Sequence, residues 1–275
     1  PDLSNLRDAT KLVSKVLNKN NIVVYESTVY PGCTEEFCGN LIEKITKFKS
    51  GKDFYLGYSP ERINPGDQVN TLETIDKLVS SQNAKITNLL KRVYEKIIQK
   101  VHSVDSIKIA EAAKVIENTQ RDLNIALINE FNMIFSKSNL DTYKILKAAS
   151  TKWNFLNFTP GLVGGHCIGI DPYYLAYFSK KIGINPQLIL SGRQINENMS
   201  KFVAKRVLSK FRKSKLNILI LGLTFKENNN DTRNSKVLDL IDFLKQDKHK
   251  ISVYDPYTNF NSLKIQKIHI VKRLN

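Results

Sequence analysis

The sequence lacks long apolar runs and has few cysteines. Its longest apolar candidate, 216–225, is about half as long as the ~18–20 residues of a membrane-spanning helix, so it predicts a buried strand. Cys33, Cys38 and Cys167 are too few for a disulfide framework in a chain of 275 residues, and their number is odd. We therefore expect a protein of a reducing compartment, the cytoplasm, with no transmembrane segment.

Acidic residues are also in short supply. There are 42 Lys plus Arg against 26 Asp plus Glu, which gives a formal net charge of +16. Lysine accounts for 33 of the 42 basic residues and is scattered through every segment, whereas specific nucleic-acid contacts favour clustered arginines and stacking aromatics. The pattern favours a solvated lysine-rich surface, whose positive field suits an anionic substrate such as a nucleotide. The alternative, a nucleic-acid-binding protein, rests on the charge alone.

Two common site signatures are missing as well. No G-x-G-x-x-G follows a strand, so the sequence contains no dinucleotide fingerprint. Cys33 and Cys38 have no Cys or His partners at zinc-ligand spacing, so we expect no metal site. The chain opens at Pro1 rather than at Met, and 200–275 holds a single βαβ unit, too small for a finished α/β domain. These ends predict a piece of a longer protein.

What the sequence does contain divides into three blocks, 1–104, 105–199 and 200–275. In the first and third, short β-branched runs alternate with helical stretches, which predicts α/β structure with parallel sheets. The expected strands are 22–25, 54–58, 78–80, 100–104, 217–222, 251–254 and 268–272, and the expected helices 4–17, 84–98, 201–215 and 235–245. Functional residues gather at the carboxyl ends of such strands, where Thr28 and Glu61 lie.

The second block is helical. No Pro or Gly interrupts 106–138, and apolar residues recur there at three- and four-residue steps, which predicts one helix of about 30 residues. A helix this long commonly bridges two domains or packs against a partner subunit. Lys114 and Asn118 share one face of it. Either they project into a cleft and stabilise an oxyanion, or they belong to a solvated face where Glu111 and Glu117 are surface charges.

A glycine-rich loop, 160–171, lies within the second block, after the predicted long helix. Its segment Gly164–Cys167 (GGHC) sets a thiol among glycines that let the backbone approach a ligand closely. Asp171 lies one helical turn beyond the thiol if a helix begins at Cys167. One interpretation is a nucleophilic thiol beside a carboxylate that orders water, and the other is a buried cysteine in a tight turn. His166 adjoins Cys167, but adjacent side chains seldom face each other, which argues against a Cys–His dyad.

Other candidates carry weaker signals. Thr28 is equally compatible with a helix N-cap, and Glu61 with a surface position in a turn. Lys226 and Arg233 follow strand 217–222 in a polar loop and are suited to binding phosphate.

Five motifs run in a fixed order along nearly the whole chain. They are Glu26–Val29 (ESTV), Ser59–Gly66 (SPERINPG), Ala110–Asn118, Gly164–Cys167 with Asp171, and Leu221–Lys226 with Asp231–Arg233. Together they resemble the UDP-glucose/GDP-mannose dehydrogenase family, and five motifs in register are far more specific than any one. SPERINPG and Thr151–Phe155 (TKWNF) most resemble the branch that acts on UDP-N-acetylhexosamines and supplies uronic acids for bacterial surface polysaccharides.

The resemblance implies two Rossmann-like domains, both truncated in this chain, joined by a central helical domain with a long connecting helix. The three blocks would be the C-terminal part of an NAD-binding domain, a central dimerisation domain and part of a UDP-sugar-binding domain. NAD would be the cofactor, a UDP-sugar the substrate and a second copy of the chain the partner. The activity implied is two successive oxidations of the sugar's C6 hydroxymethyl group to a carboxylate.

The resemblance also implies roles for single residues. Cys167 would be the nucleophile that carries first a thiohemiacetal and then a thioester. Lys114 and Asn118 would stabilise the oxyanion, Asp171 and Thr28 would position water, and Glu61 would be the general base of thioester hydrolysis. Phe225, Lys226, Gly164 and Gly165 would contact the UDP-sugar, and Thr28, Glu61 and Arg233 the NAD.

Two departures from the family pattern stand out. Some relatives carry a second glutamate four residues after the position of Glu61, where this chain has Pro65. The strand and glycine fingerprint with which the family begins are not in the sequence, so these residues alone should bind NAD poorly or not at all. Two alternatives stay open: a catalytically inactive protein that keeps the dimerisation helix, and UDP-glucose as the substrate.

Overall fold

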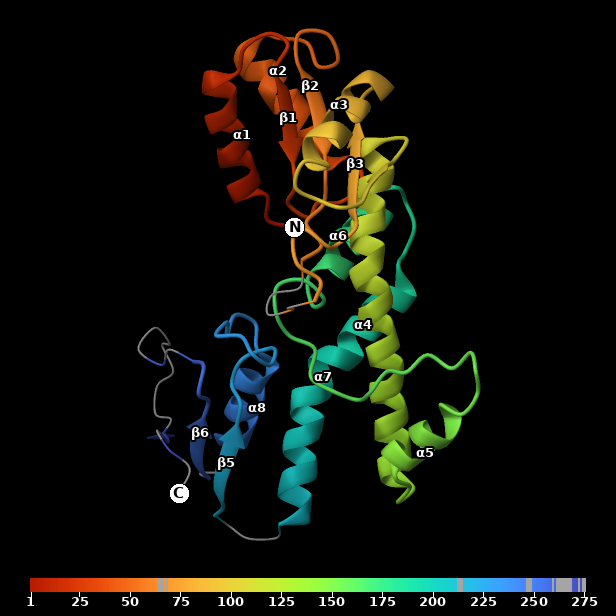
Figure 1. The fold of residues 1–275 in the computed structure, drawn as a ribbon. Helices are drawn as coiled ribbons and strands as arrows, with labels where there is room; N and C mark the ends of the chain where they lie inside the picture. The colour runs from red at the N-terminus through yellow and green to blue at the C-terminus, as the bar shows by residue number, and fades with distance from the viewer. Residues whose placement is uncertain are drawn as a thin grey trace. The chain divides into compact units, whose positions relative to one another are not determined.

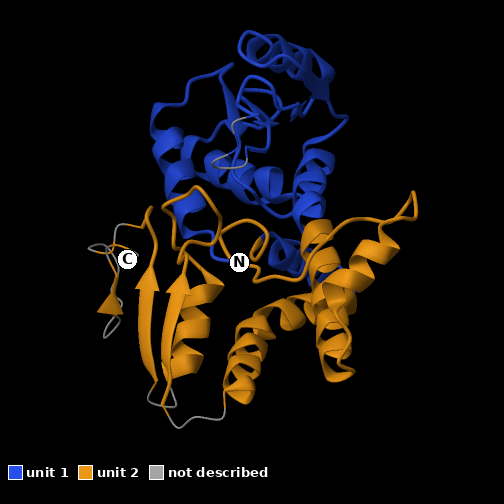
Figure 2. Ribbon diagram, turned by 60° about the horizontal axis from the view of Figure 1, so that its bottom comes forward, with its two compact units in different colours: residues 1–118, 171–186 blue, residues 119–170, 187–275 orange. Residues whose placement is uncertain are grey.

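The computed structural model describes residues 1–63, 67, 69–211, 215–245, 249–258, 260, 269–271 and 273. They form two compact units, one of 1–118 with 171–186 and one of 119–170 with 187–275 (Figure 2). The predicted long helix is present as α4 (Ile107–Lys137), which begins in the first unit and ends in the second. Across the described ranges, no helix is both long and apolar enough to span a membrane.

The first unit is built on a four-stranded sheet in the order β1-β2-β3-β4 (Figure 1). Its strands are β1 (Ile22–Tyr25), β2 (Tyr55–Tyr58), β3 (Lys77–Ser81) and β4 (Val101–Ser103). Its other helices are α1 (Ser4–Val16), the π-helix η1 (Thr34–Gly39), α2 (Asn40–Thr46), α3 (Ala84–Tyr94) and α6 (Asp171–Lys181). The strands and helices predicted for the first block are confirmed, whereas η1 and α2 escaped prediction because Gly39 interrupts their sequence pattern.

This sheet is mixed, so the prediction of a parallel sheet is wrong for the first unit. β1 pairs with β2 and β3 with β4 in parallel, but β2 and β3 are antiparallel, with Tyr58 opposite Ser80. A parallel connection needs a crossover, usually a helix, and the described residues between β2 and β3 contain none. The start of β3 therefore lies at the same edge as the carboxyl ends of β1 and β2.

A buried glutamate ties α4 to the start of η1. The two carboxylate oxygens of Glu111 accept hydrogen bonds from the backbone N–H groups of Gly32 (2.5 Å) and Thr34 (2.8 Å). Helix starts leave such N–H groups without partners inside the helix, and burial raises the pKa of Glu111. The interpretation of Glu111 as a surface charge is therefore wrong. Glu117 is partly exposed and pairs with Arg62 at 2.6 Å.

The second unit carries a three-stranded parallel sheet in the order β5-β6-β7. Its elements besides α4 are α5 (Thr142–Ala149), α7 (Gln187–Lys210), β5 (Asn217–Leu221), α8 (Lys236–Lys245), β6 (Lys250–Tyr254) and β7 (His269–Ile270). These strands and α8 confirm the prediction for the third block. Ile268, Lys272 and 212–214, which belong to predicted elements, lie outside the described residues. Helix α7 begins well before the predicted basic helix and runs through position 199 without a break.

Helices α4 and α7 meet across a buried ionic network. A Cβ at Gly192 of α7 would lie 2.4 Å from a methyl group of Leu123, so the two backbones approach closely there. Next to this contact the Arg193 guanidinium bonds the Asp122 carboxylate at 2.6 Å, with both side chains almost fully buried. Asn196 donates to the same carboxylate oxygen at 2.7 Å. A buried charge needs such partners, and Asp122 of α4 finds both of these on α7, while Arg193 also pairs with Glu197 of its own helix.

Candidate active site

The loop that carries Cys167 is held at its start by a buried asparagine. In the second unit, the Asn129 side chain of α4 donates to the carbonyl of Gly161 and accepts from its N–H, both at 2.9 Å. Asn129 also donates to the Asn196 side chain of α7 at 2.8 Å. Because both asparagines are fully buried, α4 and α7 fix the position of the loop's first residues.

The two glycines before His166 and Cys167 pack against the segment 225–235. A Cβ at Gly164 would lie 2.6 Å from the carbonyl oxygen of Asn234. Gly165 has a φ of +82°, and a Cβ there would lie 2.7 Å from the Phe225 ring. The Gly165 N–H donates to the Asn234 carbonyl at 3.2 Å. The glycines permit a close backbone approach, as predicted, and the group approached is the protein's own chain.

His166 extends the same contact. Its ring meets Phe225 edge to face, with centroids 5.5 Å apart, and its Nδ1 lies 3.6 Å from Asp231. Cys167 is partly buried within a turn, where its carbonyl accepts from Ile170 N–H at 3.1 Å. The helix that follows begins at Asp171 and not at Cys167. The prediction that Asp171 lies one helical turn beyond the Cys167 thiol is therefore wrong.

The predicted phosphate-binding residues lie in this same polar segment. The Arg233 guanidinium bonds both carboxylate oxygens of Asp231, at 2.6 and 3.0 Å, and its side chain is largely exposed. Arg233 and His166 together hold the pKa of Asp231 below its usual value, mainly through the Arg233 hydrogen bond. Because Arg233 bonds Asp231, a phosphate that binds Arg233 competes with this carboxylate. Lys226 is partly buried.

In the first unit, three predicted residues come together. Asn118 Nδ2 donates to Asp171 Oδ2 at 2.6 Å, and the charge of Lys114 acts on the same carboxylate. Lys114 and Asn118 are both buried, so the solvated-face alternative is wrong. Asp171 is only 2% exposed. Its burial outweighs the Asn118 bond and the Lys114 charge and raises its pKa to about 6.

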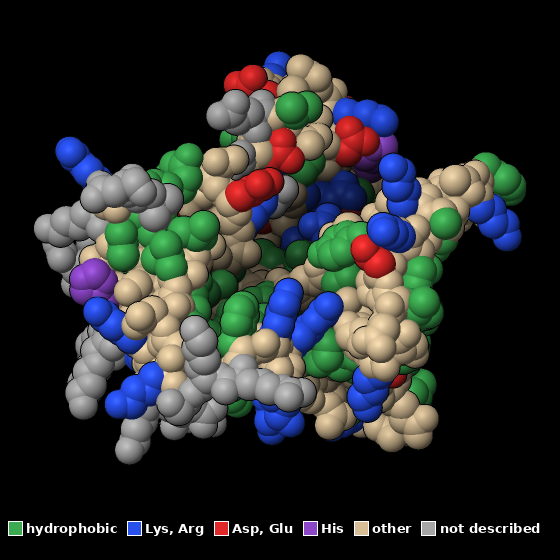
Figure 3. All heavy atoms as spheres, turned by 90° about the horizontal axis from the view of Figure 1, so that it is seen from below, with side chains coloured by type: hydrophobic (Ala, Val, Ile, Leu, Met, Phe, Trp, Pro, Cys, Tyr) green, Lys and Arg blue, Asp and Glu red, His purple; other side chains and the backbone are tan. Residues whose placement is uncertain are grey.

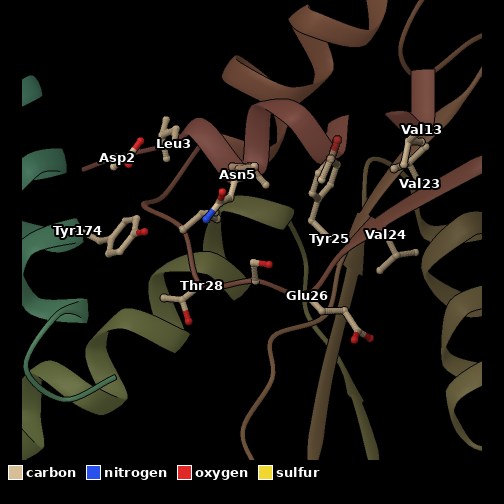
Figure 4. Close-up of a pocket in the computed structure, with 14 residues that line it drawn as sticks. Asp2, Leu3, Asn5, Val13, Val23, Val24, Tyr25, Glu26, Thr28 and Tyr174 are labelled. Carbon is tan, nitrogen blue, oxygen red and sulfur yellow. The ribbon is translucent and has the colours of Figure 1, made fainter. Parts of the chain in front are cut away.

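Thr28 lines a cavity of about 510 Å³ in the first unit, beyond the carboxyl end of β1. Its lining includes Asn5, Thr28 and Tyr174 as well as several valines (Figure 4). Seven of the fourteen lining residues have polar or charged side chains, so the cavity offers hydrogen-bonding groups beside its apolar walls. Thr28 is not a helix N-cap, because the next helix, η1, begins at Thr34.

Glu61 follows β2 at the same edge of the sheet. One of its oxygens, Oε1, accepts from the backbone N–H groups of Arg62 (2.7 Å) and Ile63 (2.6 Å). The other oxygen faces Lys77. Its side chain is half exposed, which leaves the carboxylate accessible. Pro65 and the rest of 64–66 lie outside the described residues.

Sequence analysis did not single out Asp122 and Asn129, two polar residues on a buried stripe of α4. Among the buried residues of this helix, the stripe comprises Glu111, Val115, Asn118, Asp122, Ala126 and Asn129. They recur at three- and four-residue steps, which is the signal that could have identified them. The prediction of this helix rested on its apolar residues, of which Ile109, Ile116 and Leu127 are exposed.

Basic side chains do not gather into one stripe on the face drawn in Figure 3, where they alternate with other kinds. The interpretation of the +16 charge as a solvated lysine-rich surface stays a prediction.

Comparison with protein families matches three models that belong together. They describe the UDP-glucose/GDP-mannose dehydrogenase family: its NAD binding domain at residues 1–98, its central domain at 108–198 and its UDP binding domain at 219–275. Protein CapL of Staphylococcus aureus is 52% identical over 270 residues, which are 96% of this chain and 64% of CapL. The UDP-N-acetyl-D-glucosamine 6-dehydrogenase of Salmonella typhi is 50% identical over 94% of this chain and 62% of its own length.

Solved structures share the fold. The UDP-D-ManNAc dehydrogenase of Pyrococcus horikoshii superposes with a TM-score of 0.85 at 34% identity and covers 94% of this chain, which spans 62% of that protein. An NDP-N-acetyl-D-galactosaminuronic acid dehydrogenase from Methanosarcina mazei has a TM-score of 0.84 at 26% identity, over 100% of this chain and 61% of its own. These likenesses confirm the predicted fold class. The chain spans a little under two thirds of the length of the curated relatives it matches.

The glycine contact yields a first prediction. Gly164→Ala and Gly165→Ala should each lower the free energy of unfolding by about 1–3 kcal/mol. A Cβ at position 164 would clash with backbone atoms, and an alanine at position 165 would have a strained φ and a Cβ that overlaps an aromatic ring. Gly161→Ala is the matched control, since nothing lies within 4 Å of its Cβ and its φ is not positive. Urea denaturation measures all three. Equal stability of the Gly161 and Gly164 variants would contradict the packing described.

The buried carboxylate yields a second. The pKa of Asp171 is raised from 3.8 to about 6 in the folded chain, so between pH 4 and 6 the folded state keeps a proton that the unfolded state releases. Relative to Asp171→Asn, the wild-type chain should lose stability as pH rises through this window, by about 3 kcal/mol in total. Thermal unfolding of both proteins from pH 4 to 8 provides the difference. A difference that does not change with pH would refute it.

Proposed function

The chain belongs to the UDP-glucose/GDP-mannose dehydrogenase family, and we propose that it acts in the NAD-dependent oxidation of the C6 hydroxymethyl group of a UDP-N-acetylhexosamine to the uronic acid. The single observation that carries the proposal is the Gly164–Cys167 loop, whose thiol is presented by glycines packed against 225–235. The dehydrogenases of Salmonella typhi and Pseudomonas aeruginosa, 50% and 49% identical, make UDP-N-acetyl-D-glucosamine the first candidate substrate. UDP-glucose is the second.

The chemistry proposed uses Cys167 as a covalent nucleophile. Its sulfur adds to the C6 aldehyde produced by the first oxidation and gives a thiohemiacetal, and loss of a hydride from C6 together with the proton of the C6 hydroxyl group converts this into a thioester. Water then attacks the thioester carbonyl, Glu61 accepts a proton from that water, and the C–S bond breaks to release the carboxylate and the thiol. Lys114 and Asn118 stabilise negative charge on the reacting oxygen, and Asp171 and Thr28 order water.

NAD, which would accept the hydride in each oxidation, fits the chain in part. The cavity beside Thr28 offers valine walls for a flat ring and the Thr28 hydroxyl and Asn5 amide for polar groups. Glu61 lies at the same edge of the sheet, and Arg233 supplies an exposed guanidinium for phosphate. The glycine fingerprint that takes the pyrophosphate in dinucleotide-binding folds is not within this sequence.

For the nucleotide sugar, we propose Phe225 and Lys226 as the contacts of the UDP-sugar, together with the backbone of Gly164 and Gly165. Phe225 already packs on Gly165 and His166, so the residue proposed to touch the sugar also supports the loop of the nucleophile. The product would be a uronic acid used in the cytoplasm for surface polysaccharide synthesis. The division into NAD-binding, central and UDP-binding parts follows the three blocks of the sequence.

We further propose a homodimer formed through the central helical region. In the second unit, large apolar side chains on α4, α5 and the following loop are exposed: Leu127, Ile134, Tyr143, Trp153 and Leu156. Trp153 is 90% exposed, although a tryptophan normally buries most of its ring. An apolar surface of this kind favours a second copy of the chain.

Sedimentation velocity tests the dimer. Ile134→Glu and Trp153→Glu should shift the protein to monomer, because each sets a charge in the apolar contact. Leu12→Glu is the control, since Leu12 is 64% exposed, between Ile134 (52%) and Trp153 (90%), but lies on α1, and it should stay dimeric. Monomeric wild-type protein at micromolar concentration would overturn the proposal.

The covalent mechanism predicts the outcome of one substitution. With UDP-N-acetyl-D-glucosamine and NAD, the full-length protein that contains these residues should form two NADH per sugar, and its Cys167→Ser variant should form no uronate, because no thioester is made. Cys38→Ala removes a fully buried thiol and should keep the two-NADH stoichiometry. Absorbance at 340 nm and chromatography of the nucleotide products measure this. Unimpaired uronate formation by Cys167→Ser would exclude the covalent route, and a folded dimer that forms no NADH would favour the inactive alternative.

A further inference from the structure

A buried lysine sits among carboxylates at the edge of the first unit's sheet. Lys77, the first residue of β3, is 4% exposed. Its Nζ lies 3.5 Å from Glu26 Oε1 and 3.7 Å from Glu61 Oε2, and 5.3 Å from the centroid of the Tyr94 ring. The Tyr94 hydroxyl also donates to Glu26. Lysines are almost never buried without such partners, so this one is held by the two acids and the ring.

The antiparallel pairing of β2 and β3 brings Lys77 close to Glu26 and Glu61. Gly57 pairs with Ser81 and Tyr58 with Ser80, and the same register carried three residues further sets Glu61 opposite Lys77. Glu26 follows β1 directly, and β1 runs parallel to β2. In the all-parallel sheet expected from the sequence, the first residue of β3 would lie at the opposite edge, far from both glutamates.

The two oxygens of the Glu61 carboxylate have different partners. Oε1 is occupied by the N–H groups of Arg62 and Ile63, and Oε2 is the oxygen that faces Lys77. A half-exposed glutamate otherwise samples many rotamers at similar energy. The buried Lys77 ammonium lies at one oxygen of this carboxylate and the two N–H groups lie at the other. Together they hold the carboxylate in one orientation. The ammonium also offsets the repulsion between Glu26 and Glu61, which share it.

We propose that Lys77 is a positioning residue for Glu61 and sets the orientation in which that carboxylate takes a proton from the attacking water. The inference rests on the proposed role of Glu61 in thioester hydrolysis. Lys77 acts through Glu61 and touches neither substrate nor thioester. Its loss therefore slows the hydrolytic step without weakening substrate binding.

Steady-state kinetics of the full-length protein that contains these residues, with UDP-N-acetyl-D-glucosamine and NAD, test the proposal. Lys77→Met should lower kcat for uronate formation about tenfold or more, with KM for the nucleotide sugar changed by less than about threefold. Lys77→Arg keeps the charge and should recover most of the loss. Lys100→Met is the matched control, because Lys100 is an exposed lysine paired with Asp76, and its kcat should equal that of the wild type.

A second measurement does not need activity. The Arg62 and Ile63 amides, which donate to Glu61, should exchange faster with solvent in Lys77→Met than in the wild type, while Leu56 in β2 should not change; NMR-detected exchange resolves these positions. If Lys77→Met does not fold, Lys77→Gln removes the charge while keeping a polar side chain, and both measurements apply to it.

Unchanged kcat and unchanged exchange in the folded variants would overturn the proposal, as would a loss that Lys77→Arg does not recover. If the wild type forms no NADH while the exchange result is as expected, the orientation of Glu61 by Lys77 stands and the proposed function fails.

Discussion

The space between Gly164–Gly165 and the segment 225–235 is too small for any side chain, and the position of Cys167 depends on that contact. One glycine meets a backbone carbonyl and the other the face of Phe225, in a backbone conformation that only glycine adopts cheaply. Asn129 fixes the loop from its other end. In the second unit, the loop of Cys167, the proposed nucleophile, is therefore held in place by Asn129 of α4 and by the segment 225–235.

The long helix positions buried polar groups as well as apolar core residues such as Ile107 and Ala110. On its buried stripe, Glu111 accepts two backbone N–H groups, Asp122 binds Arg193 and Asn196, and Asn129 binds the glycine loop. Each buried group would cost several kcal/mol without its partner, so each specifies one arrangement of its surroundings. At Asp171 burial outweighs its partners, and its pKa rises to about 6. A carboxylate that changes charge near neutral pH is suited to chemistry.

Local patterns in the sequence predicted much of this fold. The β-branched run 22–25 is β1, and the uninterrupted pattern of 106–138 is α4, because both depend on neighbours along the chain. The antiparallel pairing of β2 and β3 is a long-range property, and no local pattern encodes it. For the same reason, Lys77 gave no signal as a site residue. The start of α6 at Asp171 was predictable, since Pro172 follows it and proline favours the first turn of a helix.

Among the candidate residues, the sequence predicted some of the contacts and missed others. Lys114, Asn118 and Asp171 come together as the motifs implied. The glycines were expected to approach a ligand, and their partner Asn234 lies about 70 positions further along the chain, beyond the reach of any local argument.

Mass spectrometry of a trapped intermediate tests the central claim most directly. In a Glu61→Gln variant of the full-length protein, incubated with UDP-N-acetyl-D-glucosamine and NAD and then quenched in acid, the account predicts that the peptide containing Cys167 gains the mass of the nucleotide-sugar acyl group. Treatment with hydroxylamine should remove the added mass, as it does from thioesters. A variant that forms NADH while Cys167 stays unmodified, or that carries the adduct on another residue, would contradict the account.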